Sequence, residues 1–471
     1  MKSNITILLY YTTKNGIEWQ RMYLYSKERE KGRFIIMKGK KESALSMKFS
    51  GKHWWTLLYT TLLYFATAII TGTVQISAPG FAGLRGWNYA SIMSLNTIGG
   101  LISIPLTFAY AQVIRKKGVK WPTLVFGLLY GIAFMLYGSP SWAIFVIAAL
   151  VANAASNSLN MVSPNTLLTD WFPKKKGVVL GIATAGTMLA AIVAAPVVQL
   201  LVNGTSLPGA FRIAGGFIII VSLLTLFIKN TPQEAGTYPD NDPTTDMAEV
   251  AKIKEMMSGK YGWSIGKLLS NKDFWMLTIG FGLGFFALVG SAACFMPQGF
   301  EYGFSQPQML LFMTLSGIGS VIGSYILGAI DQAKSTKLAV IIYAIGMIIG
   351  CAARALGAGS HALFIVGVFA LPFFQGGLAN LMISYTIQVF GAPSYASVNR
   401  VMSPIVIAIR TLSFLVVGNV YAKLGSYKYV SWIITGLLVI SLICLLCVNS
   451  KTKELPGGMP GMPGPQAKQD S

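Results

Sequence analysis

The sequence predicts an all-α integral membrane protein whose twelve transmembrane helices form two pseudo-symmetric bundles of six. The composition, the spacing of long apolar runs and the distribution of positive charge support this prediction. Hydrophobic residues make up 54% of the 471 residues, and charged residues only 11%. This balance is typical of membrane proteins and not of soluble domains of similar length.

Twelve apolar runs are long enough for an α-helix to cross a bilayer core of ~30 Å at ~1.5 Å per residue. The first six cover about residues 54–79, 90–114, 121–139, 142–169, 176–202 and 209–229. The last six cover about residues 273–297, 308–331, 338–357, 361–389, 401–423 and 429–448. The runs therefore predict an N-terminal bundle over 54–229 and a C-terminal bundle over 273–448.

Three polar segments accompany the two bundles. Residues 1–53 form a basic leader, and its apolar run Ile5–Tyr11 is too short to span a bilayer. Residues 230–272 form a linker in which we expect a short interfacial helix. Residues 449–471 are rich in Pro and Gly, which predicts a disordered tail.

Positive charge is concentrated on one side of the predicted membrane. Of the 37 Lys and Arg residues, 31 fall in segments on the side of the termini, five on the opposite side and one, Arg410, within a span. The positive-inside rule therefore predicts cytoplasmic termini, and we expect a multi-pass, monomeric protein of the plasma membrane. The net charge of +21 could also suggest nucleic acid, but no soluble basic face or recognition motif accompanies it. We expect the lipid bilayer, and not nucleic acid, as the partner of these charges.

The two halves of the sequence resemble one another at an offset of 217 residues. The matching pairs are Thr97 with Thr314, Gly100 with Gly317, Lys117 with Lys334 and Lys120 with Lys337. All four pairs lie in or just after the second span of their half. Two six-helix repeats of this kind are typical of transporters whose substrate site lies at the midplane between the repeats.

One arginine, Arg410, lies near the middle of the apolar run Val401–Ala422. A charge there costs at least ~2.5–3.5 kcal/mol on insertion scales, so such residues usually face a bundle interior or an aqueous cavity. We hypothesise that Arg410 receives the carboxylate of an organic anion. The alternative is that it caps the carbonyls of a broken helix or fixes packing near Pro404.

Polar residues recur at helical spacing in several spans, which places each set on one helix face. These sets are Thr60, Tyr64, Thr67, Thr71 and Gln75 in the first span; Asn153, Asn157, Asn160 and Pro164 in the fourth; and Gln375, Asn380, Ser384 and Gln388 in the tenth. They could border a central aqueous cavity, or they could form interhelical hydrogen bonds worth ~0.6 kcal/mol each. We expect substrate to bind at Arg410, Tyr64, Thr71, Gln75, Asn153, Asn157, Asn160, Gln375 and Asn380.

The acidic residues constrain the mechanism. None of the sixteen Asp and Glu lies in the middle of a predicted span. A proton relay or an organic-cation site would require one there. Anion exchange or facilitated diffusion is therefore favoured, while proton symport through Asp170 or Glu301 stays open.

Nothing in the sequence indicates a catalytic or metal site. Neither of the two histidines lies beside a carboxylate or a cysteine in sequence, and all four cysteines fall in apolar runs, where they suit packing. We therefore expect no cofactor, no metal and no enzymatic activity.

Three short strings suggest a family. They are DWFPKKKG at Asp170–Gly177, KLLSNKDFW at Lys267–Trp275 and FGAPSY at Phe390–Tyr395. With two six-span halves, the chain resembles the major facilitator superfamily, and within it the branch of oxalate/formate antiporters and monocarboxylate-porter-like proteins. The resemblance implies the major facilitator fold and an alternating-access transporter of small organic anions, with a monocarboxylate favoured over a dicarboxylate.

The sequence departs from this family at two places. The loop Ala111–Lys120 keeps the basic cluster and the glycine of the family pattern G-x-x-x-D-R-x-G-R-K but lacks its acid, whereas the second half keeps Asp331 near Lys334. The eighth span offers only hydroxyl side chains where organic-anion relatives often carry an arginine, so Arg410 is the one positional match. The resemblance implies a cytoplasmic latch of Arg115, Lys116, Gly118, Asp170, Asp331 and Lys334. Alternatively, the basic residues among them only follow the positive-inside rule.

Two other functions stay open. Gly177, Gly181 and Gly186 in the fifth span would suit a flexible helix in a hydrophobic-drug efflux transporter, although small residues at this spacing are common in packed membrane bundles. A non-transporting membrane receptor could also use the same scaffold.

Overall fold

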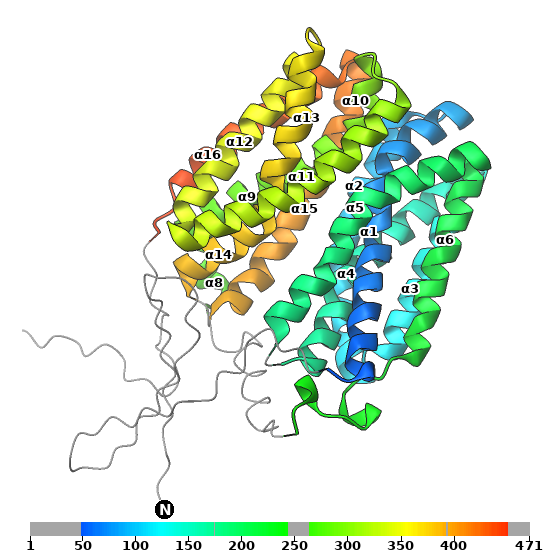
Figure 1. The fold of residues 1–471 in the computed structure, drawn as a ribbon. Coiled ribbons are helices and arrows are strands. Elements are labelled where there is room, and N and C mark those ends of the chain that lie inside the picture. The colour runs from blue at the N-terminus through cyan, green and yellow to red at the C-terminus, as the bar shows by residue number, and fades with distance from the viewer. Residues whose placement is uncertain (1–48, 174, 244–262, 392–393, 451–471) are drawn as a thin grey trace, which may run out of the picture. The chain divides into compact units, whose positions relative to one another are not determined.

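The computed structural model describes residues 49–173, 175–243, 263–391 and 394–450, and every long element among them is an α-helix (Figure 1). The predicted leader up to residue 48, residues 244–262 of the linker and the predicted tail from residue 451 onward lie outside the described residues. The helical content confirms the all-α fold class.

The N-terminal half contains six long helices. They are α1 (Gly51–Arg85), α2 (Tyr89–Lys117), α3 (Lys120–Leu136), α4 (Trp142–Trp171), α5 (Lys176–Gly204) and α6 (Leu207–Leu223), which a 3₁₀ turn extends over Leu224–Phe227. Five of these segments are long and apolar enough to cross a membrane, whereas α3, with 17 residues, is shorter. The first span is longer than predicted, because α1 continues past Pro79 to Arg85.

The C-terminal half supplies the remaining spans. They are α9 (Lys272–Ala293), α11 (Gln306–Ala333), α12 (Thr336–Leu356), α13 (His361–Gln375) with α14 (Leu378–Phe390), α15 (Tyr395–Leu424) and α16 (Tyr427–Leu446). Two short helices, α8 (Ile265–Leu269) and α10 (Phe295–Glu301), flank α9. Among the described residues, eleven segments are long and apolar enough to span a membrane. Together with α3 they account for all the predicted spans.

The tenth span is divided into α13 and α14 at Gly376 and Gly377, which the sequence pattern did not predict. A Cβ atom at Gly376 would lie 1.8 Å from the carbonyl oxygen of Ser320 in α11. Only glycine allows the two backbones to approach this closely. Close packing against α11 therefore requires glycine at this point of the span.

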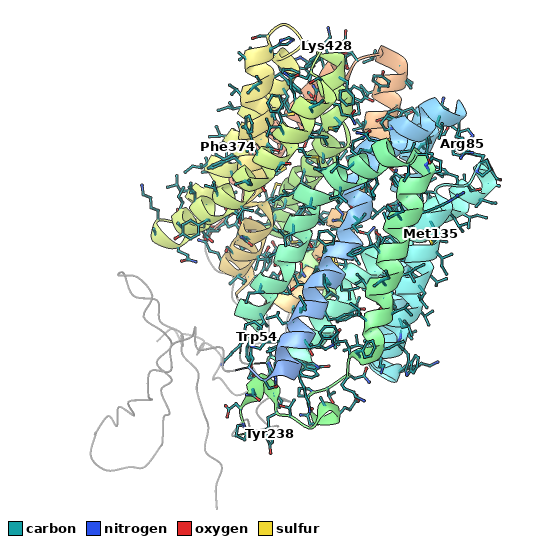
Figure 2. All side chains as sticks on the ribbon, turned by 45° about the vertical axis from the view of Figure 1, so that its right-hand side comes forward. Trp54, Arg85, Met135, Tyr238, Phe374 and Lys428 are labelled. Carbon is teal, nitrogen blue, oxygen red and sulfur yellow. The ribbon has the colours of Figure 1, made fainter. Side chains whose placement is uncertain are left out.

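Short connections make successive spans cross in alternate directions, so α1 starts and α16 ends at the same face of the bundle (Figure 1). We call this the terminal face. Figure 2 shows Trp54 and Tyr238 at this face and Arg85 and Lys428 toward the opposite face.

The described basic residues are distributed unequally between these faces. Those at the terminal face are Lys52, Arg115, Lys116, Lys117, Lys120, Lys175, Lys229, Lys267, Lys272, Lys334, Lys337 and Arg400; those toward the opposite face are Arg85, Arg212, Arg354, Lys423 and Lys428. Arg354, at the end of the predicted span 338–357, is the buried one among these five residues. It lies inside the last turn of α12 and is only 2% exposed, because Gln298 of α10 offers it a buried acceptor.

Two pairs of helices make the closest contacts between the two halves. Between α2 and α15, the Thr97 hydroxyl donates to the Thr411 carbonyl at 2.8 Å, and a Cβ atom at Gly100 would lie 2.2 Å from Thr411 Cγ2. Between α5 and α11, a Cβ atom at Gly317 would lie 2.4 Å from Ile192 Cγ1. Gly100 and Gly317 are partners in the sequence repeat, and each lies where its half meets the other.

Aromatic rings join the halves nearer the opposite face. Tyr89 of α2 contacts Tyr421 and Tyr427, with ring centroids 5.6 and 6.5 Å away, and the latter two rings stack at 4.2 Å. An apolar cluster adds Ile76 of α1 and Ala195 of α5 to Phe295 and Met309 of the C-terminal half. The two halves are therefore packed together between their middle and the face opposite the terminal face.

We predict that Gly100→Ala destabilises the protein by ~1–3 kcal/mol, because the added methyl group overpacks the contact with Thr411. The measurement is thermal unfolding of the purified protein in detergent. Adding Thr411→Ser should recover part of the loss, since it removes the methyl group that the new Cβ meets.

Gly216→Ala in α6 is the matched control, because nothing lies within 4 Å of a Cβ atom there. This substitution should leave the midpoint unchanged or raise it through the better helix propensity of alanine. Equal midpoints for the Gly100 and Gly216 variants would contradict the packing described here.

Candidate functional site

Arg410 lies near the middle of α15 and reaches across to the N-terminal half. Its Nη2 atom donates a hydrogen bond of 2.8 Å to Oδ1 of Asn157, which lies near the middle of α4. Both side chains are half-buried. The arginine that the sequence placed at the midplane therefore lies at the junction of the two halves.

The neighbour of Arg410 in sequence fixes its helix to a second element of the N-terminal half. Thr411 accepts the hydrogen bond from Thr97 of α2 through its carbonyl group, while Arg410 contacts α4. Consecutive residues of α15 thus contact two different helices. Within the described residues, the guanidinium donates to a side-chain oxygen and to no backbone carbonyl, which does not favour a carbonyl-capping role near Pro404.

The Asn157 amide is oriented by the backbone of its own helix, and the neighbouring Asn153 side chain links α4 to α2. Asn157 Nδ2 donates to the Asn153 carbonyl at 2.9 Å, and Asn153 Nδ2 donates to Oδ1 of Asn96 in α2 at 3.1 Å. Asn153 also donates to the Ala149 carbonyl at 2.9 Å. The first of these bonds orients the Asn157 amide so that its oxygen faces Arg410.

The charge of Arg410 is not neutralised by a protein carboxylate in the described part of the chain. The described acidic residues, all within connections or near helix ends, are Asp170, Glu234, Asp240, Asp242, Asp273, Glu301 and Asp331. None of them forms an ion pair with Arg410. A cation with a neutral partner attracts anions, by ~4 kcal/mol at 4 Å and an effective dielectric near 20.

The other residues predicted on α1 and α4 occupy different environments. Asn160 Nδ2 donates to the Thr67 hydroxyl at 2.8 Å and so links α4 to α1. Tyr64 and Asn153 are only 4% and 7% exposed and pack inside the N-terminal bundle, whereas Thr71 is exposed. The side chain of Gln75 lies outside the described part of the structure.

Gln375 and Asn380 contact other residues of the C-terminal half. Gln375 Nε2 donates to the Ser291 hydroxyl at 3.0 Å, and Asn380 Nδ2 donates to the Ser324 hydroxyl at 3.1 Å. Among the described contacts, none joins either residue to Arg410.

A second polar cluster, which the sequence did not predict, surrounds the buried Arg354. Its guanidinium donates to Gln298 Oε1 at 2.6 Å and to the Ser291 carbonyl at 3.1 Å. Gln298 is fully buried and donates to Tyr302 and Ser431 in turn. Burial raises the pKa of the Tyr302 phenol, so this group stays neutral. The only sequence signal was an arginine at the end of an apolar run.

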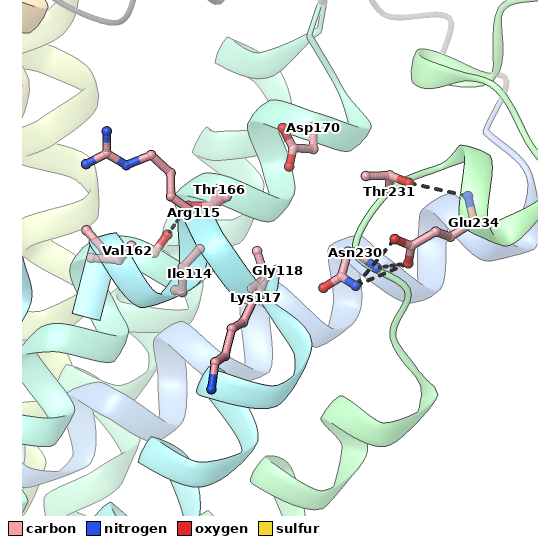
Figure 3. Close-up of a pocket in the computed structure, with 12 residues that line it drawn as sticks. Ile114, Arg115, Lys117, Gly118, Val162, Thr166, Asp170, Asn230, Thr231 and Glu234 are labelled. Atoms are coloured by element: carbon pink, nitrogen blue, oxygen red, sulfur yellow. Dashed lines mark hydrogen bonds between the residues drawn. The ribbon is translucent and has the colours of Figure 1, made fainter. Parts of the chain in front are cut away.

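Figure 3 shows a cavity of about 690 Å³ at the terminal face, between α2, α4 and the segment after α6. Arg115, Gly118 and Asp170, all predicted latch residues, line this cavity together with Asn230 and Glu234, whereas Lys116 does not. The Arg115 side chain points away from Asp170 (Figure 3). The structure therefore brings these residues to one place without pairing Arg115 with Asp170.

The remaining latch residues lie on α11 in the other half. Asp331 accepts a hydrogen bond from the Thr336 hydroxyl, and Lys334 is exposed just after the helix end. No contact among the described residues joins them to Arg115, Lys116 or Gly118.

Gly118 has a backbone conformation that favours glycine. Its φ is +76° and its ψ is 174°, a combination found almost only in glycine. Asn230 closes over it, since Asn230 Oδ1 accepts the Lys120 backbone N–H at 2.9 Å and would lie 2.7 Å from a Cβ atom at position 118. The glycine is therefore required both by the backbone turn and by the close side chain.

We predict that Gly118→Ala lowers the stability of the protein by ~1–3 kcal/mol through backbone strain, and further through the clash with Asn230. Thermal unfolding in detergent measures the loss. Gly425→Ala is the control, because Gly425 also has a positive φ, +66°, but has nothing within 4 Å of its Cβ position. A loss for Gly118→Ala no larger than for Gly425→Ala would contradict the combined strain and close contact described here.

Comparison with known proteins gives consistent results. The family model described as Major Facilitator Superfamily matches residues 60–409. The hexuronate transporter of Escherichia coli (strain K12) is 22% identical over 403 residues, which are 80% of this chain and 90% of that protein. Monocarboxylate transporter 12 of Homo sapiens is 23% identical over 293 residues, 58% of this chain and about half (52%) of that relative.

A solved structure shares the fold. It is a bacterial homologue of the human lysosomal transporter Spinster in an inward-facing and occupied conformation, with a TM-score of 0.60 and 14% sequence identity. The match covers 85% of this chain and 97% of that one. At this identity the likeness concerns the fold alone.

Proposed function

The chain belongs to the Major Facilitator Superfamily, and from this premise we propose that it transports a small organic anion by alternating access. As a member of this family it is a multi-pass membrane carrier and not an enzyme. The observation that carries the anion proposal is Arg410, a cation at the junction of the halves whose described partner, Asn157, is neutral.

One central cation suits a substrate with one carboxylate. A guanidinium can hold a carboxylate through two parallel, charge-assisted hydrogen bonds, a geometry that lysine cannot reproduce. The names of two relatives support this substrate class, because a hexuronate and a monocarboxylate each carry a single carboxylate. The polar residues predicted around Arg410, among them Asn160, Thr71 and Gln375, would then select the rest of the molecule.

We propose that the termini are cytoplasmic and that the protein lies in the plasma membrane as a monomer. The excess of described basic residues at the terminal face supports this orientation. In this orientation the contacts of Tyr89 with Tyr421 and Tyr427 close access to the site from the extracellular side. Alternating access would separate these rings while Arg115, Lys116, Gly118 and Asp170 approach Asp331 and Lys334 on the inner side.

One of the glycines that suggested drug efflux, Gly186, has a packing explanation. A Cβ atom at Gly186 would lie 2.1 Å from the Thr61 carbonyl oxygen, so this glycine allows α5 to pack closely on α1. Gly181 has nothing within 4 Å of its Cβ position. No observation therefore favours efflux. Any flux of substrate into proteoliposomes would exclude the other alternative, a receptor that does not transport.

We predict that Arg410→Ala lowers carboxylate uptake by about 10- to 100-fold, the range expected when hydrogen bonds to a charged group are lost. Arg410→Lys should recover little, because it keeps the charge but loses the paired geometry. Counterflow in proteoliposomes with labelled D-glucuronate, lactate and other organic acids measures both. Equal uptake by the wild type and both variants would reject the role of this arginine.

We further predict that exchange of the transported acid continues at an unchanged rate after a protonophore has collapsed the pH gradient. The reason is that the described acidic residues lie near helix ends or in connections, where none can relay protons through the middle of the bundle. Strict dependence of exchange on an imposed gradient would instead favour symport through Asp170 or Glu301.

A further inference from the structure

We infer that Asn157 competes with the substrate carboxylate for Arg410, so that this asparagine sets the affinity for the anion and ties the halves together when no anion holds the arginine. This inference rests on the proposed function, because it concerns the same site. It assigns Asn157 the role of a protein acceptor that the substrate replaces, and not that of a direct substrate contact.

The first argument is the fixed orientation of the Asn157 amide. Its nitrogen donates at 2.9 Å to the backbone carbonyl of Asn153, one helical turn earlier, which is fixed by the helix itself. The oxygen of Asn157 is therefore presented to Arg410 as a ready acceptor. An amide that could turn freely would not be so well prepared to hold a cation.

The second argument is the position of the bond. The 2.8 Å bond from Arg410 to Asn157 joins α15 of one half directly to α4 of the other, near the middle of both helices. Alternating access places the substrate between the halves, where Arg410 is the cation that a carboxylate would meet. The bond to Asn157 uses Nη2, one of the two terminal nitrogens that the carboxylate would use there.

The third argument is the choice of donor atom. A carboxylate binds a guanidinium through a pair of N–H groups, either from both terminal nitrogens or from Nε and one terminal nitrogen. Arg410 Nη2 donates to Asn157, and this leaves fewer of the paired arrangements open. A carboxylate accepts more strongly than a neutral amide, so replacement of Asn157 by the substrate is favourable.

The exchange has a consequence for transport. Without substrate, the bond of Arg410 to Asn157 must break before the halves can rearrange at this level. With substrate, the carboxylate satisfies the arginine, so the bond between α15 and α4 no longer has to break, and the bond from Thr97 to the Thr411 carbonyl is the same in both cases. Loaded carriers should therefore reorient faster than unloaded ones, which favours exchange over net flux.

The test uses the purified full-length protein and the rate at which phenylglyoxal modifies Arg410, followed by mass spectrometry of the peptide. Asn157→Leu should raise this rate about fivefold or more without any added acid, since one hydrogen bond is lost. Asn157→Asp should lower it by pairing the guanidinium with a carboxylate. If Asn157→Leu fails to fold, the lower modification rate expected for Asn157→Asp still tests the competition.

Asn165→Leu is the control on the same helix, because Asn165 donates to the Met161 carbonyl and pairs with Tyr64, and no described contact joins it to Arg410. Its Arg410 should be modified at the wild-type rate. Modification of Arg410 in Asn157→Leu at the wild-type rate would overturn the inference.

The same reaction measures anion binding through protection of Arg410 by D-glucuronate and by lactate. Competition predicts that Asn157→Leu lowers the half-protecting concentration about fivefold or more, by the same lost bond. A raised or unchanged concentration would mean that Asn157 does not compete, and would overturn this inference alone. If neither acid protects the wild type or Asn157→Leu, the proposed function fails, and the competition with it.

Discussion

A positive charge in the middle of a membrane-spanning bundle needs polar partners. Arg410 finds its partner in the other half of the protein, so this interaction joins the two halves. Its partner is an amide oxygen of Asn157, so the charge is held but not neutralised. A carboxylate in the place of Asn157 would have made a closed ion pair with little attraction for an anion. A neutral partner instead keeps the middle of the bundle electropositive.

Close packing between the halves allows this contact to form. Gly100 lets α2 approach Thr411, the residue next to Arg410, and Gly317 does the same between α11 and Ile192 of α5. The two glycines are repeat partners, so the internal repeat has a physical meaning here. Each half places a glycine at the same point of its second helix, where the other half comes closest. Side chains at these points would hold α15 away from the N-terminal half and Arg410 away from Asn157.

The sequence predicted the parts of this structure that depend on length and composition. The spans follow from apolar runs, and the position of Arg410 in the middle follows from the length of its run. Helical periodicity placed Asn153, Asn157 and Asn160 on one side of α4, but it cannot say which neighbour each one meets. In the structure they contact α2, Arg410 and α1, respectively. The burial of Arg354 was equally hidden, because its acceptor Gln298 lies 56 residues away in the chain.

The central claim, that Arg410 is the anion site, is tested most directly by an experimental structure of the protein saturated with an acid that it transports. The account predicts carboxylate density within hydrogen-bond distance of the Arg410 guanidinium and between α4 and α15, with Asn157 no longer bonded to Arg410. Density for the acid elsewhere, with the bond from Arg410 to Asn157 intact, would contradict it.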